Sequence, residues 1–387
     1  MATAVPVRTA PYTPVPRLPA LRDFTPNWYA TVMGTAIVAN AGAVLPVPVP
    51  RPVLVLVWAL SAVLLALVGA ARAGHWLRHR DRARAHLLDP EIAPAVAPFY
   101  GCASMAPLAV GIGTLTVGAD VIGTTAAVSV AAVLFAIGTA VGLAAAVVVP
   151  YLLITHHRPA PGTASPVWLL PVVGPMVSAS FGPLLAARLP SGGWRETLLL
   201  ASAGMFGVSL LATLVILPLV FARLVHHGPL PLALTPSLFL VLGPLGQSTT
   251  AVTNMAALPS PYTEDFRTLA VLYGVPALGF ALLWLALAGA MVVRAARLGM
   301  PFTMGWWAFT FPVGTCVTGA AGLAHRTDLG AFGWLATGLY ALLVAAWAVT
   351  GLRTLRGLFS GALLAAPRPA PPAPRPATDR TRSDGDR

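Results

Sequence analysis

The sequence predicts an all-α polytopic membrane protein. Of its 387 residues, 57% are apolar and only 9% carry a formal charge, whereas about 25% are charged in an ordinary soluble domain. Apolar runs of about 20 residues, the helix length that crosses a hydrocarbon core about 30 Å thick, follow one another along the chain. Because so little polar surface is available, a soluble protein is excluded.

Ten apolar segments are candidate membrane spans, and short polar connections separate them. A chain with ten spans has both of its ends on the same side of the membrane. The expected spans are 24–44, 51–72, 97–117, 122–154, 165–189, 194–224, 231–257, 265–293, 303–324 and 331–353.

The two ends of the chain differ from its middle in composition. Residues 1–23 and 356–387 are rich in proline and arginine and show no apolar periodicity. Such segments cannot bury enough apolar surface to fold. We therefore expect a disordered cytoplasmic arm at 1–23, a transmembrane domain at 24–355 and a disordered cytoplasmic tail at 356–387.

The arginines test this topology, because membrane proteins concentrate basic residues in their cytoplasmic connections. All 24 basic residues are arginine, and ten spans place nineteen of them on the side of the chain ends. The bias predicts a multi-pass protein of the plasma (inner) membrane with both termini in the cytoplasm. Nucleic-acid binding is disfavoured, since the charges are scattered over short connections rather than gathered on one face. The five arginines on the other side are Arg51, Arg188, Arg195, Arg267 and Arg326.

Odd and even spans differ in their content of proline, glycine and hydroxyl residues. The even spans are aliphatic, whereas each odd span is interrupted near its middle, for example by Pro107 or by Gly243-Pro244. Broken backbone at membrane depth is tolerated only where protein or a water-filled cavity satisfies it. We therefore expect five helical hairpins around a central pore, with the odd spans inside. Tight helix packing, which also uses small residues, is the alternative explanation.

The absence of charge from the span cores narrows the function. All twelve carboxylates lie outside these cores, which disfavours cation pumps, channels with acidic rings and membrane enzymes that need acidic metal ligands. The eight histidines are expected in connections. We expect no catalytic residue, no metal site and no cofactor. Hydroxyls, amides and backbone dipoles suit anions or neutral solutes.

Four segments carry a resemblance to a known family: FTPNWYATVMGTAIVANAG, WLLPVVGPMVSASFGPLLA, LGPLGQSTTAV and GWWAFTFPVGT. Together they resemble the tellurite-resistance/dicarboxylate transporter family, which includes malate permeases, sulfite efflux pumps, a tellurite-resistance protein and the slow anion channels of plants. The resemblance covers about residues 22 to 355. It implies ten helices as five hairpins around a pore, and a homotrimer in which each protomer has its own pore.

The resemblance also implies a pore gate. Channel members carry a phenylalanine on the ninth helix that plugs the pore, and the matching residue here is Phe311. Phe309 lies about 200° around the helix and should face elsewhere; simple packing of the Phe311 ring is the alternative. Side-chain chemistry suggests Gln247, Ser248 and Ser178 as hydrogen-bond donors to an oxyanion. The full set of pore-lining or substrate-contact candidates is Gly34, Thr35, Pro107, Pro175, Ser178, Gly243, Pro244, Gln247, Ser248 and Pro312.

The first functional prediction is a carrier for a four-carbon dicarboxylate such as malate. Sulfite or tellurite efflux, and a Phe-gated chloride or nitrate channel, are the alternatives within the family. A non-transporting membrane scaffold is disfavoured, because interrupted helices would then have no purpose. The expected partners are a small anion, the lipid bilayer and further copies of the chain.

Overall fold

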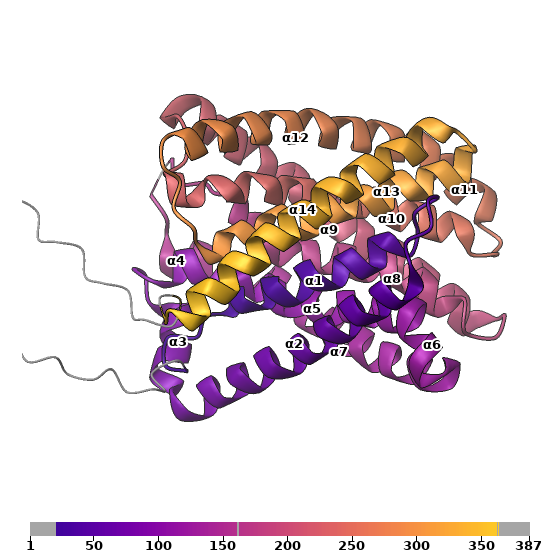
Figure 1. Cartoon of the computed structure of the whole chain (residues 1–387), viewed down its shortest axis with the longest axis horizontal. Coiled ribbons are helices and arrows are strands. Elements are labelled where there is room, and N and C mark those ends of the chain that lie inside the picture. Colours follow the sequence, from indigo (N-terminus) through magenta and orange to yellow (C-terminus); the bar gives the residue numbers. More distant parts are fainter. Residues whose placement is uncertain (1–20, 161, 362, 364–387) are drawn as a thin grey trace, which may run out of the picture.

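The computed structural model describes residues 21–160, 162–361 and 363 (Figure 1). Every regular element in this part of the chain is a helix, which confirms the all-α prediction for the described residues. The two expected arms lie mostly outside it. The described chain begins and ends at the same end of the molecule, which we call the terminal side. The short helices α3 (Arg80–Leu88) and α4 (Ala93–Val96) also lie there, and α6 (Ala119–Ile122) lies at the opposite end.

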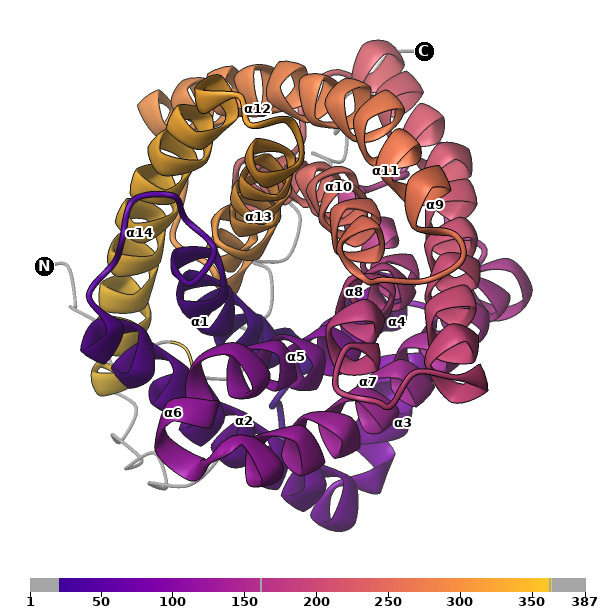
Figure 2. The same ribbon diagram turned by 90° about the vertical axis from the view of Figure 1, so that its right-hand side faces the viewer.

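Five helices form an inner ring, which Figure 2 shows end-on. Each packs against its neighbours around the ring, and most residues in them are buried. They are α1 (Tyr29–Gly42), α5 (Tyr100–Gly113), α8 (Leu170–Ala186), α10 (Leu242–Ala257) and α13 (Phe311–Thr327).

Longer helices surround this ring, and each inner helix packs against the outer helix that follows it in the chain. Their apolar side chains are largely exposed on the outward face, as expected of helices in contact with lipid. They are α2 (Arg51–Arg78), α7 (Thr124–Leu152), α9 (Gly193–His227), α12 (Gly274–Arg297) with α11 (Thr263–Leu272) before it, and α14 (Gly330–Phe359).

The inner helices are continued by irregular helical turns. A 3-10 segment precedes each of them, and two of these segments begin with proline, whose missing N–H costs little in a first turn. The 3-10 segments are η1 (Pro26–Trp28), η2 (Ala97–Phe99), η5 (Pro166–Leu169), η6 (Leu232–Val241) and η7 (Met304–Phe309), and π-helical turns follow α5 as η3 (Thr114–Gly118) and α7 as η4 (Leu153–His157).

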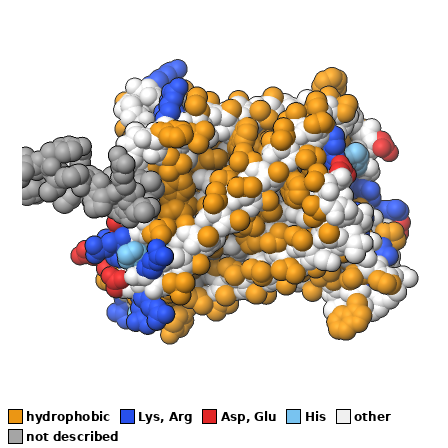
Figure 3. All heavy atoms as spheres, turned by 60° about the horizontal axis from the view of Figure 1, so that its bottom comes forward, with side chains coloured by type: hydrophobic (Ala, Val, Ile, Leu, Met, Phe, Trp, Pro, Cys, Tyr) orange, Lys and Arg blue, Asp and Glu red, His pale blue; other side chains and the backbone are white. Residues whose placement is uncertain are grey.

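Apolar side chains cover the middle of the molecule, and charged side chains gather at its two ends (Figure 3). Among the described residues, eight helical segments are long and apolar enough to cross a membrane. In the five outer ones, 22–28% of the most apolar stretch is buried, against 67–94% in the three inner ones. The segments around α1 and α10, whose α-helical parts have 14 and 16 residues, are not among the eight.

The structure corrects the expected start of the C-terminal tail. Helix α14 continues to Phe359, past the expected boundary at 356, because Leu355 and Leu358 extend its apolar face. At the other end, the chain from residue 21 is held against α2 and α3: the ring of His75 is 2.7 Å from the Leu21 carbonyl, and Arg82 pairs with Asp23 at 3.1 Å.

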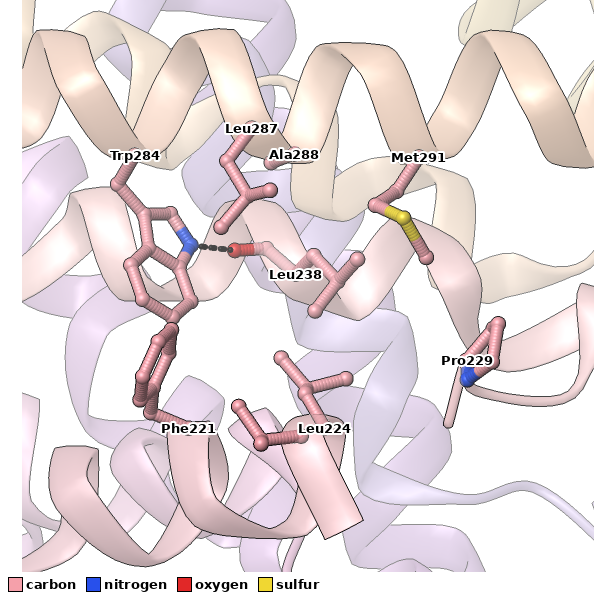
Figure 4. A pocket seen from close by; sticks show the side chains of 9 residues that line it. Phe221, Leu224, Pro229, Leu238, Trp284, Leu287, Ala288 and Met291 are labelled. Atoms are coloured by element: carbon pink, nitrogen blue, oxygen red, sulfur yellow. Dashed lines mark hydrogen bonds between the residues drawn. The ribbon is translucent and has the colours of Figure 1, made fainter. Parts of the chain in front are cut away.

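Neighbouring outer helices diverge in places and leave the inner layer uncovered. Figure 4 shows one such groove of about 280 Å³ between α9 and α12. Its floor is η6, and the Trp284 indole donates to the Leu238 carbonyl there at 2.9 Å. A larger groove lies between α2 and α14.

The crossing of α5 and α8 yields a stability prediction. A Cβ added at Gly101 would lie 2.0 Å from the Leu170 carbonyl oxygen and 2.7 Å from the Pro171 nitrogen, which are backbone atoms that cannot move aside. We expect Gly101→Ala to destabilise the protein by about 1–3 kcal/mol, as overpacking does. Thermal unfolding in detergent measures this change.

Gly279→Ala is the matched control, because no atom lies within 4 Å of its added Cβ on α12. Alanine should there stabilise the helix by about 0.5–1 kcal/mol. Equal unfolding temperatures for the two variants would contradict the close approach of α5 and α8.

Candidate functional site

A constriction lies where all five inner helices meet. It is lined by Met33 of α1, Met105 of α5, Val173 of α8, Gly243 of α10 and Phe311 of α13, together with Leu169, Leu170, Leu240 and Pro312. The free space between them is about 10 Å³. This is the lower limit for a single water molecule, so the axis is closed at this level.

Phe311 and Phe309 occupy different environments. The Phe311 side chain lines the constriction and is 2% exposed. The Phe309 ring packs edge-to-face on Phe239, with ring centroids 4.8 Å apart, and on Trp306 at 5.7 Å. Only Phe311 of this pair therefore lines the constriction.

A polar chamber of about 160 Å³ adjoins the constriction and is also lined by all five inner helices. On each of them the chamber residues follow the constriction residues in sequence, so the chamber lies on the side away from the terminal side. Its polar side chains are Asn40, Thr116, Ser180, Gln247, Thr250, Asn254, Thr318 and His325.

Hydrogen bonds tie the chamber wall together. Ser180 is its centre: the Gln247 amide donates to the Ser180 hydroxyl, and the Asn254 amide donates to the Ser180 carbonyl at 2.8 Å. The hydroxyls of Thr250 and Thr318 join α10 to α13 at 2.7 Å. Among the described residues, the side-chain oxygens of Gln247 and Asn40 are buried without a hydrogen-bond partner.

The electrostatics of the path come from dipoles rather than from charges. No Asp, Glu, Arg or Lys is among the described residues that line either cavity, and the titratable His325 is exposed at the chamber mouth. Leu170, Leu242 and Phe311 are the first residues of α8, α10 and α13 and lie at the constriction, where the 3-10 segments η5, η6 and η7 precede these helices. The amides and hydroxyls of the chamber wall are therefore the dipoles that face the path.

The structure brings together only part of the expected site. Gly243, Pro312 and Phe311 line the constriction, and Gln247 lines the chamber. The other candidates line neither cavity. Pro107, Pro175 and Pro244 are buried within α5, α8 and α10.

Three hydroxyl candidates bond to outer helices instead. Thr139 of α7 donates to Ser178 at 2.9 Å, Tyr273 before α12 donates to Ser248 at 2.8 Å, and Trp347 of α14 donates to Thr35 at 3.1 Å. The neighbouring Gly34 packs against Thr310 and Trp307. Successive residues of an α-helix lie about 100° apart around its axis, so the neighbour of a residue that lines a cavity can face an outer helix. We therefore leave these four residues out of the site.

Sequence reasoning also missed residues that line the chamber. The eight histidines were expected in connections, but His75 lies within α2 and His325 within α13. After Phe311, the lining residues Thr318, Gly322 and His325 follow at intervals of seven, four and three residues, so all four lie on one face of α13. This spacing was the signal that would have found them.

Within the described residues, no group of three or more His, Cys, Asp or Glu side chains is placed to hold a metal ion.

Comparisons with known proteins agree with this geometry. The family profile described as voltage-dependent anion channel (SLAC1) matches residues 23–355. The chain belongs to the voltage-dependent anion channel family. This confirms the family resemblance, because the profile covers nearly the whole described chain.

Curated relatives of this anion channel family match over most of their length. The chain is 27% identical over 351 residues to an uncharacterized transporter of Methanocaldococcus jannaschii, covering 89% of this chain and 96% of that protein. It is 28% identical over 342 residues to the sulfite efflux pumps of Trichophyton rubrum and Arthroderma benhamiae, covering 85% of this chain and 89% of each pump.

The chamber geometry yields a prediction for Gln247. Replacing it by leucine removes one hydrogen-bonding amide from the wall, and a lost hydrogen bond to a charged group costs about 1.5–3 kcal/mol. We expect Gln247→Leu to raise the half-saturating anion concentration for flux into proteoliposomes by at least about tenfold.

Ser248→Ala is the matched control, since this adjacent hydroxyl contacts Tyr273 rather than the chamber. Its half-saturating concentration should stay close to that of the wild type. An unchanged value for Gln247→Leu would remove Gln247 from the site.

Proposed function

We propose that this chain carries a small oxyanion of the sulfite class across the membrane, along the axis of its five inner helices. The observation that carries the proposal is the pair of cavities built by all five of these helices. Amides and hydroxyls can stabilise an anion there without a fixed countercharge.

The size of the chamber supports the smaller of the expected substrates. A volume of about 160 Å³ above a constriction of about 10 Å³ suits a compact oxyanion better than a four-carbon dicarboxylate with two charged ends. The two fungal relatives named as sulfite efflux pumps support the same choice and suggest the outward direction. Malate, the first prediction from the sequence, is the competing substrate in the test below.

We further propose that Phe311 is the gate. Its ring is surrounded by the apolar side chains of Met33, Met105, Val173 and Leu240. An apolar constriction blocks ions both by its size and by excluding water. Opening requires that this ring move from the axis.

The membrane arrangement proposed is ten crossings as five hairpins. The segments around α1 and α10 are the two crossings beyond the eight apolar spans. With their 3-10 extensions they run from 26 to 42 and from 232 to 257. Both termini lie in the cytoplasm of a cell with this protein in its plasma membrane. The family resemblance supports a homotrimer with one path in each protomer.

The gate is tested by anion flux into proteoliposomes, with chloride, nitrate, sulfite and malate offered separately, with and without a proton gradient. We expect the wild type to move sulfite faster than malate. Phe311→Ala should raise the flux of small anions by about tenfold, which corresponds to a barrier lower by about 1.4 kcal/mol.

Phe309→Ala is the control, because this ring packs on Phe239 and Trp306 outside the constriction. Equal leaks in both variants would place the gate elsewhere. If the wild type moves malate in preference to sulfite, the substrate is the dicarboxylate.

The topology is tested separately by a reporter enzyme that is active only outside the cytoplasm. Fused after residue 387, it should stay silent, because ten crossings return the chain to the cytoplasm. Fused in the loop between α8 and α9, at residue 191, it should be active. The reverse pattern would overturn the orientation.

A further inference from the structure

Four inner helices end around the mouth of the chamber that lies away from the terminal side, hereafter the outer mouth. A chamber-lining residue lies within the last turn of each of them: Asn40 of α1, Leu184 of α8, Asn254 of α10 and His325 of α13. The last four carbonyls of an α-helix have no partner within the helix and carry a partial negative charge. An anion at the outer mouth therefore meets an unfavourable field unless positive charge offsets it.

Two of the five arginines expected on this side are attached to the walls of the chamber. Arg326 lies in the last turn of α13, four residues after the lining residue Gly322, and donates to the Ala256 carbonyl near the end of α10 at 3.2 Å. Arg51 donates to the carbonyl of the lining residue Thr116 at 2.6 Å. Neither arginine lines the chamber itself, but each guanidinium is held against an element that does. Figure 3 shows basic side chains at this end of the molecule, opposite the terminal side.

The charges of these two arginines are compensated to different degrees. Arg51 pairs with Asp120 at 2.5 Å, and both side chains are nearly half exposed. Among the described residues, no carboxylate forms an ion pair with Arg326. The full charge of Arg326 therefore acts on the outer mouth, whereas Asp120 cancels part of the charge of Arg51.

We propose that Arg326 and Arg51 form a positive rim at the outer mouth, which offsets the negative helix ends and lets a small anion pass between the chamber and the surrounding water. The inference rests on the proposed function, because it takes the chamber as the path of an anion. The rim acts by Coulomb attraction, so the charge of each side chain matters more than its shape. Its effect falls with salt, since the Debye length shrinks from about 10 Å at 0.1 M to about 3 Å at 1 M.

The test measures the dissociation constant of nitrate for the purified full chain in detergent by isothermal titration calorimetry. Nitrate is a small oxyanion whose single charge does not change with the working pH. We expect Arg326→Gln to weaken nitrate binding by roughly three- to tenfold at low ionic strength, because a full charge is lost beside the mouth. Arg326→Lys keeps the charge and should bind nitrate nearly as well as the wild type. The difference between the two variants should shrink in about 1 M potassium gluconate, whose anion is large.

The pair of Arg51 and Asp120 separates an electrostatic role from a structural one. Arg51→Gln should weaken nitrate binding by about two- to threefold, whereas Asp120→Asn leaves the guanidinium uncompensated and should strengthen binding by a similar factor. A pair that served only to hold the fold together would respond differently, because both substitutions break the same contact and would shift binding in the same direction.

The exposed pair of Arg267 and Glu264 is the matched control. These two side chains are 2.5 Å apart in α11, a helix that does not line the chamber. Arg267→Gln and Glu264→Gln should each leave nitrate binding unchanged. All of the substituted side chains are exposed or half-exposed, so the comparison does not depend on repacking of the core.

Unchanged nitrate binding by Arg326→Gln would contradict the rim, as would shifts in the same direction for Arg51→Gln and Asp120→Asn. A wild type that binds no nitrate would contradict it too. Flux into proteoliposomes, measured in parallel, decides the proposed function separately. If the variants shift nitrate binding as expected but the wild type moves no anion, the rim stands and the proposed transport fails.

Discussion

Hydrogen bonding inside the bilayer is the constraint on which the rest of this structure depends. A polar group without a partner in hydrocarbon costs several kcal/mol, so backbone and hydroxyl groups must be satisfied within the protein. Ser104 meets this demand by donating across to the Gly138 carbonyl at 2.8 Å, and Trp58 donates to Thr114 at 3.1 Å. The polar side chains of the inner helices are consequently turned toward protein, and the outer helices present aliphatic surface.

The start of α13 connects the path to the outer surface. Trp307 forms part of the floor of the α2–α14 groove and packs on Gly34, whereas Phe311 lines the constriction only four residues later. Between them, Thr310 is fully buried where the 3-10 segment η7 gives way to the α-helix. The α2–α14 groove and the constriction are therefore separated by only a few residues of chain at the start of α13.

The path is electrically neutral in its side chains, and the arginines are kept at the ends of the molecule. Arg51 shows how such an end is built: it pairs with Asp120 and donates to the Thr116 carbonyl at 2.6 Å, where the π-helical turn η3 leaves that carbonyl accessible. The charge thus stabilises irregular backbone at the chamber side. Dipoles and neutral hydrogen-bonding groups are left to act on the anion.

The sequence by itself determined the class of the protein and the sorting of its helices. Composition alone excluded a soluble domain, and the alternation of interrupted and aliphatic segments separated inner from outer helices. These properties follow from the chemistry of each segment in lipid, which needs no knowledge of its neighbours. The family, too, was recognisable from four short segments and matches residues 23–355.

Only the tertiary structure decided which faces of the inner helices line the path. Gln247 and Ser248 are adjacent, yet one lines the chamber and the other bonds to Tyr273; Ser178 and Ser180 divide in the same way. The inner helices are buried on all sides, so polarity does not reveal their rotation, as it does for a half-exposed helix. Packing against the neighbouring helices sets that rotation.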